Sequence, residues 1–123
     1  MDRNCILLVD DSVLVRTNLR RAFEEAGWKV CGEAGSGHEA IEKVKELTPH
    51  VVVVDLSMPG MDGITTAQAL KKILPEVRII LYTMHGDLVR RQDVRSAGIS
   101  AVFSKTNPLE DLLDKALHLA NAA

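Results

Sequence analysis

Residues 51–63 read VVVVDLSMPGMDG. The four consecutive valines show no polar alternation, which is typical of a strand buried on both faces of a parallel sheet. Asp55 ends this strand, and Pro59, Gly60 and Gly63 indicate that a loop follows it. We therefore expect Asp55 at the carboxyl edge of the sheet, facing solvent, where open α/β sheets bind their ligands.

Similar strand patterns lie on both sides of this segment. Apolar runs at 5–9, 77–82 and 99–103 predict three more strands, and the alternating segment 28–34 predicts an edge strand exposed on one face. Apolar residues at helical spacing lie between them. Strands and helices that alternate five times predict the α/β class, with a doubly wound five-stranded parallel sheet in the flavodoxin-like order 2-1-3-4-5. The helix predicted over 87–97 has few apolar residues among many charges. We expect that helix to be weakly anchored and able to move.

Composition restricts the class of protein and its partners. The 123 residues, 46% of them hydrophobic, predict a single domain over residues 1–123 without an output domain. A net charge of −2 and 3% aromatic residues argue against binding to nucleic acid or to a membrane surface. Because no signal peptide or membrane span precedes Asp10, we expect a cytoplasmic location. Cys5 and Cys31 lack CxxC spacing, so we expect buried, reduced thiols rather than a disulfide.

Polar residues follow four of the predicted strands at the same edge of the sheet. They are Asp10 with Asp11, Asp55, Thr83 and Lys105. Three carboxylates in one place repel one another, so their ionisation requires a cation. Mg²⁺ suits such a site, because it takes oxygen ligands and needs only one or two carboxylates. The set fits phosphoryl transfer, with Asp55 as the nucleophile and Lys105 and Thr83 holding phosphoryl oxygens.

These residues, in this order and spacing, resemble the receiver domain of bacterial two-component response regulators over essentially the whole chain. The segment Thr83-Met84-His85, and Thr106 in place of a proline after Lys105, are similar to receivers that precede helix-turn-helix output domains. The resemblance implies that Asp55 becomes a 4-aspartylphosphate, with a sensor histidine kinase or a histidine phosphotransfer protein as the donor.

The resemblance also implies a metal site and a signalling switch. Asp11, Asp55 and the backbone carbonyl of Ser57 would bind Mg²⁺ directly, with Asp10 acting largely through water. Thr83 and Lys105 would form the switch pair, and the last two helices with the strand between them would be the output face. Such a protein is not an enzyme beyond its own phosphorylation and dephosphorylation, and it signals to a downstream protein, either alone or as a homodimer formed on phosphorylation.

Two details modify this expectation. Val102 occupies the switch position where receivers usually carry Tyr or Phe, with Phe103 beside it, which argues against the usual rotamer switch. Ser57 and His85 each lie two residues beyond a site residue. We expect their replacement to change the lifetime of the phosphorylated state without abolishing phosphorylation.

Three alternatives remain beside this interpretation. A phosphatase or dehalogenase-like hydrolase also uses an aspartyl intermediate, but it places its acid/base two residues after the nucleophile, and here Asp10 and Asp11 are followed by Ser12. A flavin-binding domain of the same architecture does not suit an edge rich in acids and poor in aromatics. A receiver-like interaction module without phosphoryl chemistry would lack the acceptor, the acid pair or the lysine, and none of these is missing here. Only Val102 favours this alternative.

Overall fold

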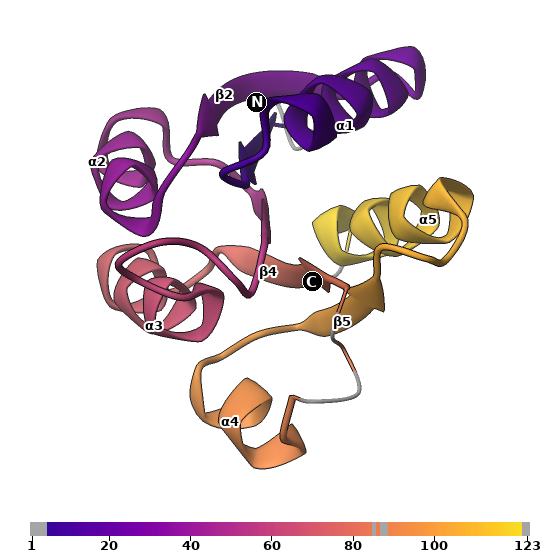
Figure 1. The fold of residues 1–123 in the computed structure, drawn as a ribbon. Helices are drawn as coiled ribbons and strands as arrows, with labels where there is room; N and C mark the ends of the chain where they lie inside the picture. Colours follow the sequence, from indigo (N-terminus) through magenta and orange to yellow (C-terminus); the bar gives the residue numbers. More distant parts are fainter. Residues whose placement is uncertain (1–4, 85, 87–88, 122–123) are drawn as a thin grey trace.

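The structure is a computed structural model, and it describes residues 5–84, 86 and 89–121. Strands and helices alternate along the chain, and five parallel strands form one sheet in the order β2-β1-β3-β4-β5 (Figure 1). The elements are β1 (Cys5–Val9), α1 (Val13–Glu25), β2 (Lys29–Ala34), α2 (Gly37–Leu47), β3 (Val51–Val54), α3 (Gly63–Ile73), β4 (Arg78–Thr83), α4 (Arg91–Ser96), β5 (Ala101–Ser104) and α5 (Leu109–Asn121). The predicted fold class and strand order are confirmed.

Helices cover both faces of the sheet. Helices α1 and α5 lie on one face, and α2, α3 and α4 lie on the other (Figure 1). In β3, Val51 and Val53 pack in the core cluster shared with α1 and α5, whereas Val52 and Val54 pack in the cluster on the opposite face. All four valines are at most 1% exposed, as the valine run predicts. In the part of the chain that the structure describes, no helix is long and apolar enough to cross a membrane.

Helix α4 is the least anchored helix. It spans Arg91–Ser96, shorter than the predicted 87–97, and none of its residues is buried. Residues 87 and 88 of the predicted helix lie outside the described residues. A cavity of about 490 Å³ lies beside α4, lined in part by Val94 of the helix and Val102 of β5. Few buried contacts make local opening inexpensive, so the prediction of a weakly anchored helix is confirmed.

The loop after β3 is held tightly against the start of α3. The Asp62 side chain caps α3 by accepting a hydrogen bond from the Thr65 amide at 2.8 Å. The Gly63 amide donates to the carbonyl oxygen of Leu56 at 2.8 Å. A Cβ at position 63 would lie 2.3 Å from the Asp55 carbonyl oxygen, so only glycine permits this approach. The glycine thereby sets the path of the loop that follows Asp55.

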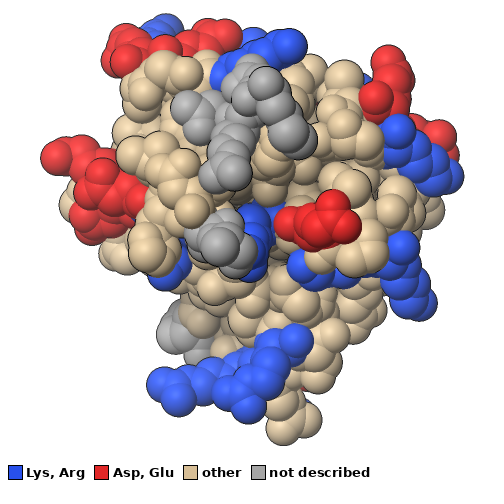
Figure 2. All heavy atoms as spheres, turned by 180° about the vertical axis from the view of Figure 1, so that it is seen from behind, with Lys and Arg blue, Asp and Glu red and all other residues tan. Residues whose placement is uncertain are grey.

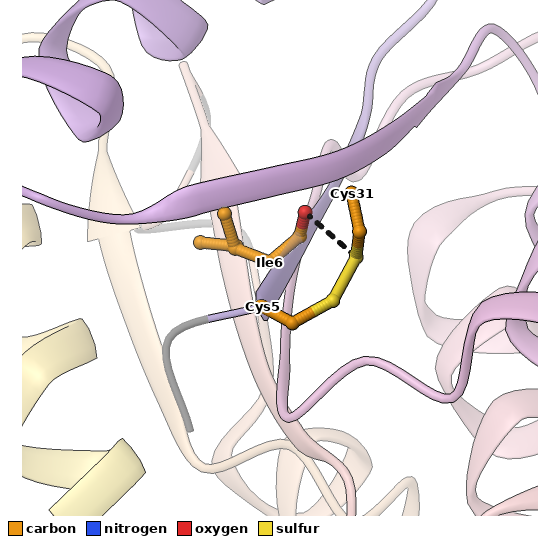
Figure 3. Close-up of a disulfide and its surroundings, with 3 residues drawn as sticks. All are labelled: Cys5, Ile6 and Cys31. Atoms are coloured by element: carbon orange, nitrogen blue, oxygen red, sulfur yellow. Dashed lines mark hydrogen bonds between the residues drawn. A yellow bond between two sulfur atoms is a disulfide. The ribbon is translucent and has the colours of Figure 1, made fainter. Parts of the chain in front are cut away.

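Cys5 and Cys31 form a disulfide between β1 and β2 (Figure 3). The expectation of two reduced thiols is therefore wrong for this structure. The reason lies in the strand register: Ile6 pairs with Val30 and Leu7 with Gly32, so Cys31 is an extra residue in β2. This irregularity brings Cys31 to a Cα–Cα distance of 5.6 Å from Cys5, within the range of disulfides. Such a register cannot be read from cysteine spacing.

Candidate functional site

Three carboxylates gather at the carboxyl edge of the sheet. Ligand oxygens of Asp10, Asp11 and Asp55 all lie within 4.8 Å of one another. Asp10 and Asp55 are buried, and Asp11 is exposed. The expectation that Asp55 faces solvent is wrong, because its side chain is only 9% exposed. Lys105 Nζ lies 3.4 Å from this carboxylate, and ligand oxygens of Asp10 and Asp11 lie within 4.8 Å of it.

Backbone hydrogen bonds place these residues at one level. The Asp10 amide donates to Ala34 O at 3.0 Å, and the Asp55 amide donates to Val9 O at 2.9 Å. The Lys105 amide likewise donates to Thr83 O at 2.9 Å. Each of these bonds continues a strand pairing by one residue beyond a strand end. The parallel sheet therefore brings together residues up to 95 positions apart in the chain.

Lys105 joins the acidic cluster through two ion pairs. Its Nζ lies 2.7 Å from Asp10 Oδ2 and 3.4 Å from Asp55 Oδ2. Burial lowers the pKa of the Lys105 ammonium, but the hydrogen bond and charge of Asp10, with those of Asp55, outweigh it and raise the pKa above its ordinary value. The ammonium also lies 5.8 Å from the ring centroid of Tyr82, within cation–π distance. Lys105 is therefore a charged group held in place at the site.

The environment of Asp55 disfavours its charge. Burial raises the pKa of the Asp55 carboxyl above its ordinary value, and the negative charge of Asp10 raises it further. The charge and hydrogen bond of Lys105 oppose this shift, as does a hydrogen bond from the Ser57 backbone. Lys105 and the Ser57 backbone therefore do not offset the combined effect of burial and the charge of Asp10 on the pKa of Asp55. Additional positive charge at this edge would favour the ionised form.

The residues of the cluster fit a divalent cation. Three carboxylates and one ammonium leave a net negative charge, and oxygen atoms within 4.8 Å of one another match the ligands that Mg²⁺ prefers. Ser57 lies in the exposed loop after β3, and its backbone contacts the Asp55 carboxylate. The ligation of Mg²⁺ by the Ser57 carbonyl stays a prediction. His85, paired with Ser57 in the lifetime hypothesis, lies outside the described residues.

Thr83 and Val102 meet near Gly86. Thr83 ends β4 and is 1% exposed, whereas Val102 is 36% exposed. A Cβ at Gly86 would lie 3.7 Å from Val102 Cγ1 and 3.9 Å from Thr83 Cγ2. Phe103 packs with the cluster beneath α1 and α5, while Val102 faces the cavity beside α4. Because successive strand residues point to opposite faces, Phe103 cannot replace an aromatic residue at position 102.

An ion-pair network beside the cluster was not predicted from the sequence. The Arg16 guanidinium donates to the Asp10 carbonyl oxygen and binds Glu33 Oε1 at 3.0 Å. Arg20 Nε binds the other Glu33 oxygen at 2.6 Å. Burial raises the pKa of Glu33, but hydrogen bonds from Arg20 and Arg16 outweigh it and hold the pKa below its ordinary value. The only sequence signal was the spacing of Arg16 and Arg20, four apart on one helix face.

The fold and the acidic edge together define a doubly wound α/β domain of the type expected for a receiver, and comparison with known proteins identifies its family. The model of the response regulator receiver domain matches residues 6–117. The chain therefore belongs to the receiver domain family of two-component response regulators.

Relatives include both short and longer proteins. The chain is 38% identical to chemotaxis protein CheY of Bacillus subtilis strain 168 over 109 residues, which cover 89% of this chain and 91% of that protein. It is 37% identical to transcriptional regulatory protein PdtaR of Mycobacterium tuberculosis strain H37Rv over 110 residues, 88% of this chain and 52% of that protein. The chain thus spans about half the length of PdtaR.

A solved structure shares the fold closely. The crystal structure of a CheX–CheY–BeF₃–Mg²⁺ complex from Borrelia burgdorferi matches with a TM-score of 0.85 and 27% identity. The match covers 94% of this chain and 87% of that one. A receiver fold with an acidic pocket formed by Asp10, Asp11 and Asp55 is thereby established for the chain.

Proposed function

We propose that Asp55 accepts a phosphoryl group and that the chain relays this event as a signal. The observation that carries the proposal is the arrangement at the sheet edge. The Asp55 carboxylate has a lysine ammonium at 3.4 Å, and the oxygens of Asp10 and Asp11 lie within 4.8 Å. A phosphoryl transfer site needs a positioned nucleophile and positive charge around the transferred group, and these residues supply the nucleophile and part of the charge.

Each residue has a separate part in this reaction. A carboxylate oxygen of Asp55 attacks phosphorus, and the P–N bond of the donor phosphohistidine breaks. Asp11, Asp55 and the Ser57 carbonyl would hold Mg²⁺, with Asp10 acting through water. When bound there, Mg²⁺ supplies positive charge that offsets the repulsion between phosphoryl oxygens and carboxylates. Lys105 is shared by two carboxylates in this structure, and its flexible side chain lets it pair with a phosphoryl oxygen.

The switch would act through Thr83 and the neighbouring helix α4. The Thr83 hydroxyl would bond a second phosphoryl oxygen and draw the end of β4 toward the site. Val102 and Gly86 lie beside Thr83, and they also line the cavity next to α4. Since α4 buries none of its residues, a small displacement there would shift an equilibrium between two positions of the helix. The surface formed by α4, β5 and α5 would present the change to a downstream protein.

The phosphoryl donor would be a sensor histidine kinase or a histidine phosphotransfer protein in the cytoplasm. Membership of the receiver family supports a protein donor, and the absence of a membrane-spanning helix among the described residues is compatible with that compartment. The response would pass to a protein, by the chain alone or by a homodimer that forms on phosphorylation. The chain would act on no other substrate, because its chemistry is confined to its own carboxylate.

Intact-protein mass spectrometry tests the proposal directly. The protein is incubated with acetyl phosphate, with and without Mg²⁺, beside the variants Asp55→Asn and Asp62→Asn. Asp62 provides a matched control, because it is a loop carboxylate that caps α3 and lies outside the cluster. We expect one Mg²⁺-dependent phosphoryl adduct on the unmodified protein and on Asp62→Asn, and none on Asp55→Asn.

Other outcomes have distinct meanings. An adduct that persists in Asp55→Asn would refute the assignment of the acceptor. Metal binding without an adduct would mean that the site does not accept phosphoryl groups from small donors. The test would then be repeated with a phosphorylated histidine protein as the donor. Neither metal binding nor an adduct would favour an interaction module without phosphoryl chemistry.

A further inference from the structure

We propose that the Cys5–Cys31 disulfide is a reversible redox site, reduced in the folded protein by a dithiol that enters at the amino-terminal edge of the sheet. This edge lies at the opposite ends of the strands from the acidic cluster, so the proposal concerns a second site. The disulfide joins the first residue of β1 to the edge strand β2. Figure 3 shows the two sulfurs bonded between these strands.

A cavity beside Cys5 offers a reductant a route toward the disulfide, although Cys5 itself is only 8% exposed. Cys5 lines a cavity of about 390 Å³ together with Lys29, His50 and Glu76. A volume of this size lies in the range of small-molecule sites. Lys29 pairs with Cys5 across the two strands and brings a positive charge to the lining of this cavity, with Glu76 as the negative charge of the same lining. A positive charge favours the approach of a thiolate and the release of thiolate sulfur.

The reduced form has a hydrogen-bond acceptor already in place. Cys31 Sγ lies 3.4 Å from the carbonyl oxygen of Ile6, as Figure 3 shows. After reduction, this oxygen is within reach of the Cys31 thiol as a hydrogen-bond acceptor. The reduced thiol would therefore not be left without a hydrogen-bond partner, which is compatible with a reversible site.

The strand register confines the effect of reduction to one end of β2. Only Lys29 and Val30 precede the irregularity at Cys31, and β2 has a neighbour on one side only. The far end stays attached, because Glu33 binds Arg16 and Arg20, and the Asp10 amide bonds Ala34 O. Loss of the disulfide therefore loosens residues 29–31 while the sheet persists.

The chemistry is a thiol–disulfide exchange with a dithiol as reductant. A thiolate of the dithiol attacks Cys5 Sγ, a mixed disulfide forms, and Cys31 leaves as a thiolate that takes up a proton. The second thiol of the reductant then attacks its own mixed-disulfide sulfur and releases Cys5 as a thiol. The reductant becomes a disulfide, and the protein gains two electrons and two protons. In the reducing compartment proposed above, disulfides are mostly of this transient kind.

Alkylation of thiols in the native state tests the proposal. The protein is equilibrated with mixtures of reduced and oxidised dithiothreitol, alkylated and weighed, while circular dichroism follows the fold. We expect no alkylated cysteine at the oxidising end, two at the reducing end, and unchanged secondary structure throughout. Two alkylated cysteines at the oxidising end would overturn the disulfide itself. Reduction that occurs only in denaturant would overturn its reversibility in the folded protein.

Hydrogen exchange and two variants locate the effect. Reduction is expected to increase amide exchange at 29–31 and to leave β4 unchanged; the Cys5→Ala/Cys31→Ala variant should not respond to reductant. Lys29→Gln should slow reduction by 2-mercaptoethanesulfonate several-fold, because its reacting thiolate form carries two negative charges. It should slow reduction by 2-mercaptoethanol less, because that thiolate carries one negative charge. Equal slowing with both thiols, or with neither, would overturn the role of the charged cavity. The same alkylation on Asp55→Asn separates this result from the phosphoacceptor proposal, because both sulfurs remain in that variant.

Discussion

Loss of the Cys5–Cys31 disulfide should lower the free energy of unfolding by a calculable amount. The two cysteines are 26 residues apart in sequence. A cross-link closing a loop of this size restricts the unfolded chain by about 12 cal/mol/K, which corresponds to about 3.5 kcal/mol at 25 °C. For a domain of this length the loss lowers the Tm by roughly 10–15 °C. The protein stays folded at 25 °C if its stability is in the usual range of about 5–15 kcal/mol.

Urea denaturation with and without dithiothreitol measures this difference, and the chain carries its own probe. Trp28 is the sole tryptophan, is 5% exposed, and packs edge to face on Phe23 just before β2 begins. Its fluorescence should report a lower midpoint in reductant, and a larger m-value because the reduced unfolded chain exposes more surface. The Cys5→Ala/Cys31→Ala variant should give the reduced midpoint under both conditions. Equal midpoints for the unmodified protein with and without reductant would refute the reasoning.

Four further predictions concern the acidic site and its support. Asp55→Asn should stabilise the metal-free protein, on the order of 1 kcal/mol, because it removes a buried charge that Asp10 repels; a lower urea midpoint would contradict this. Gly63→Ala should lower the free energy of unfolding by about 2–3 kcal/mol and slow labelling by acetyl phosphate, because its Cβ would meet the Asp55 carbonyl oxygen. Gly60→Ala is the control: at φ 85° with open space around it, it should lower the free energy of unfolding by about 1–2 kcal/mol and leave labelling intact. The pKa of Glu33 is lowered in the folded protein, so this residue stabilises the fold above pH 4.5 and loses that contribution as the pH falls through the lowered pKa. Glu33→Gln should therefore make stability depend less on pH in the acid range. Parallel stability–pH curves for the two proteins would exclude the effect. Thr83→Ala should still be phosphorylated but should lose the change in amide exchange at α4, and equal changes in both proteins would count against the switch.

Local sequence patterns predicted most of the fold. The valine run at 51–54 identified the central strand, because a strand covered on both faces has no polar positions. The boundaries of α4 were the weakest part of the prediction, since six residues without a buried side chain or a side-chain cap leave little periodic signal. The start of α1 is also fixed locally, because the Ser12 hydroxyl accepts a hydrogen bond from the Val15 amide at 3.2 Å.

The acidic edge was predictable for the same kind of reason. Asp10, Asp11, Asp55 and Lys105 each follow a predicted strand, and parallel strands place their carboxyl ends at one edge. The burial of Asp55 was not predictable, because it depends on packing between segments that are distant in the sequence. The closer approach of Lys105 to Asp10 than to Asp55 was not predictable either. Its Nζ lies 2.7 Å from Asp10 Oδ2 and 3.4 Å from Asp55 Oδ2, and a difference of this size depends on side-chain packing.

By itself, the sequence determined the order of strands and helices and the residues available for chemistry at the edge of the sheet. These features follow from periodicity and strand ends, which involve neighbours in the chain. Only the tertiary structure decided that Cys31 meets Cys5, that Arg16 supports Asp10, and that Phe103 faces away from the switch. Each of these outcomes depends on register or on packing between segments distant in sequence. A shift of one residue in a strand moves its side chains to the opposite face of the sheet, and no local sequence pattern records such a shift.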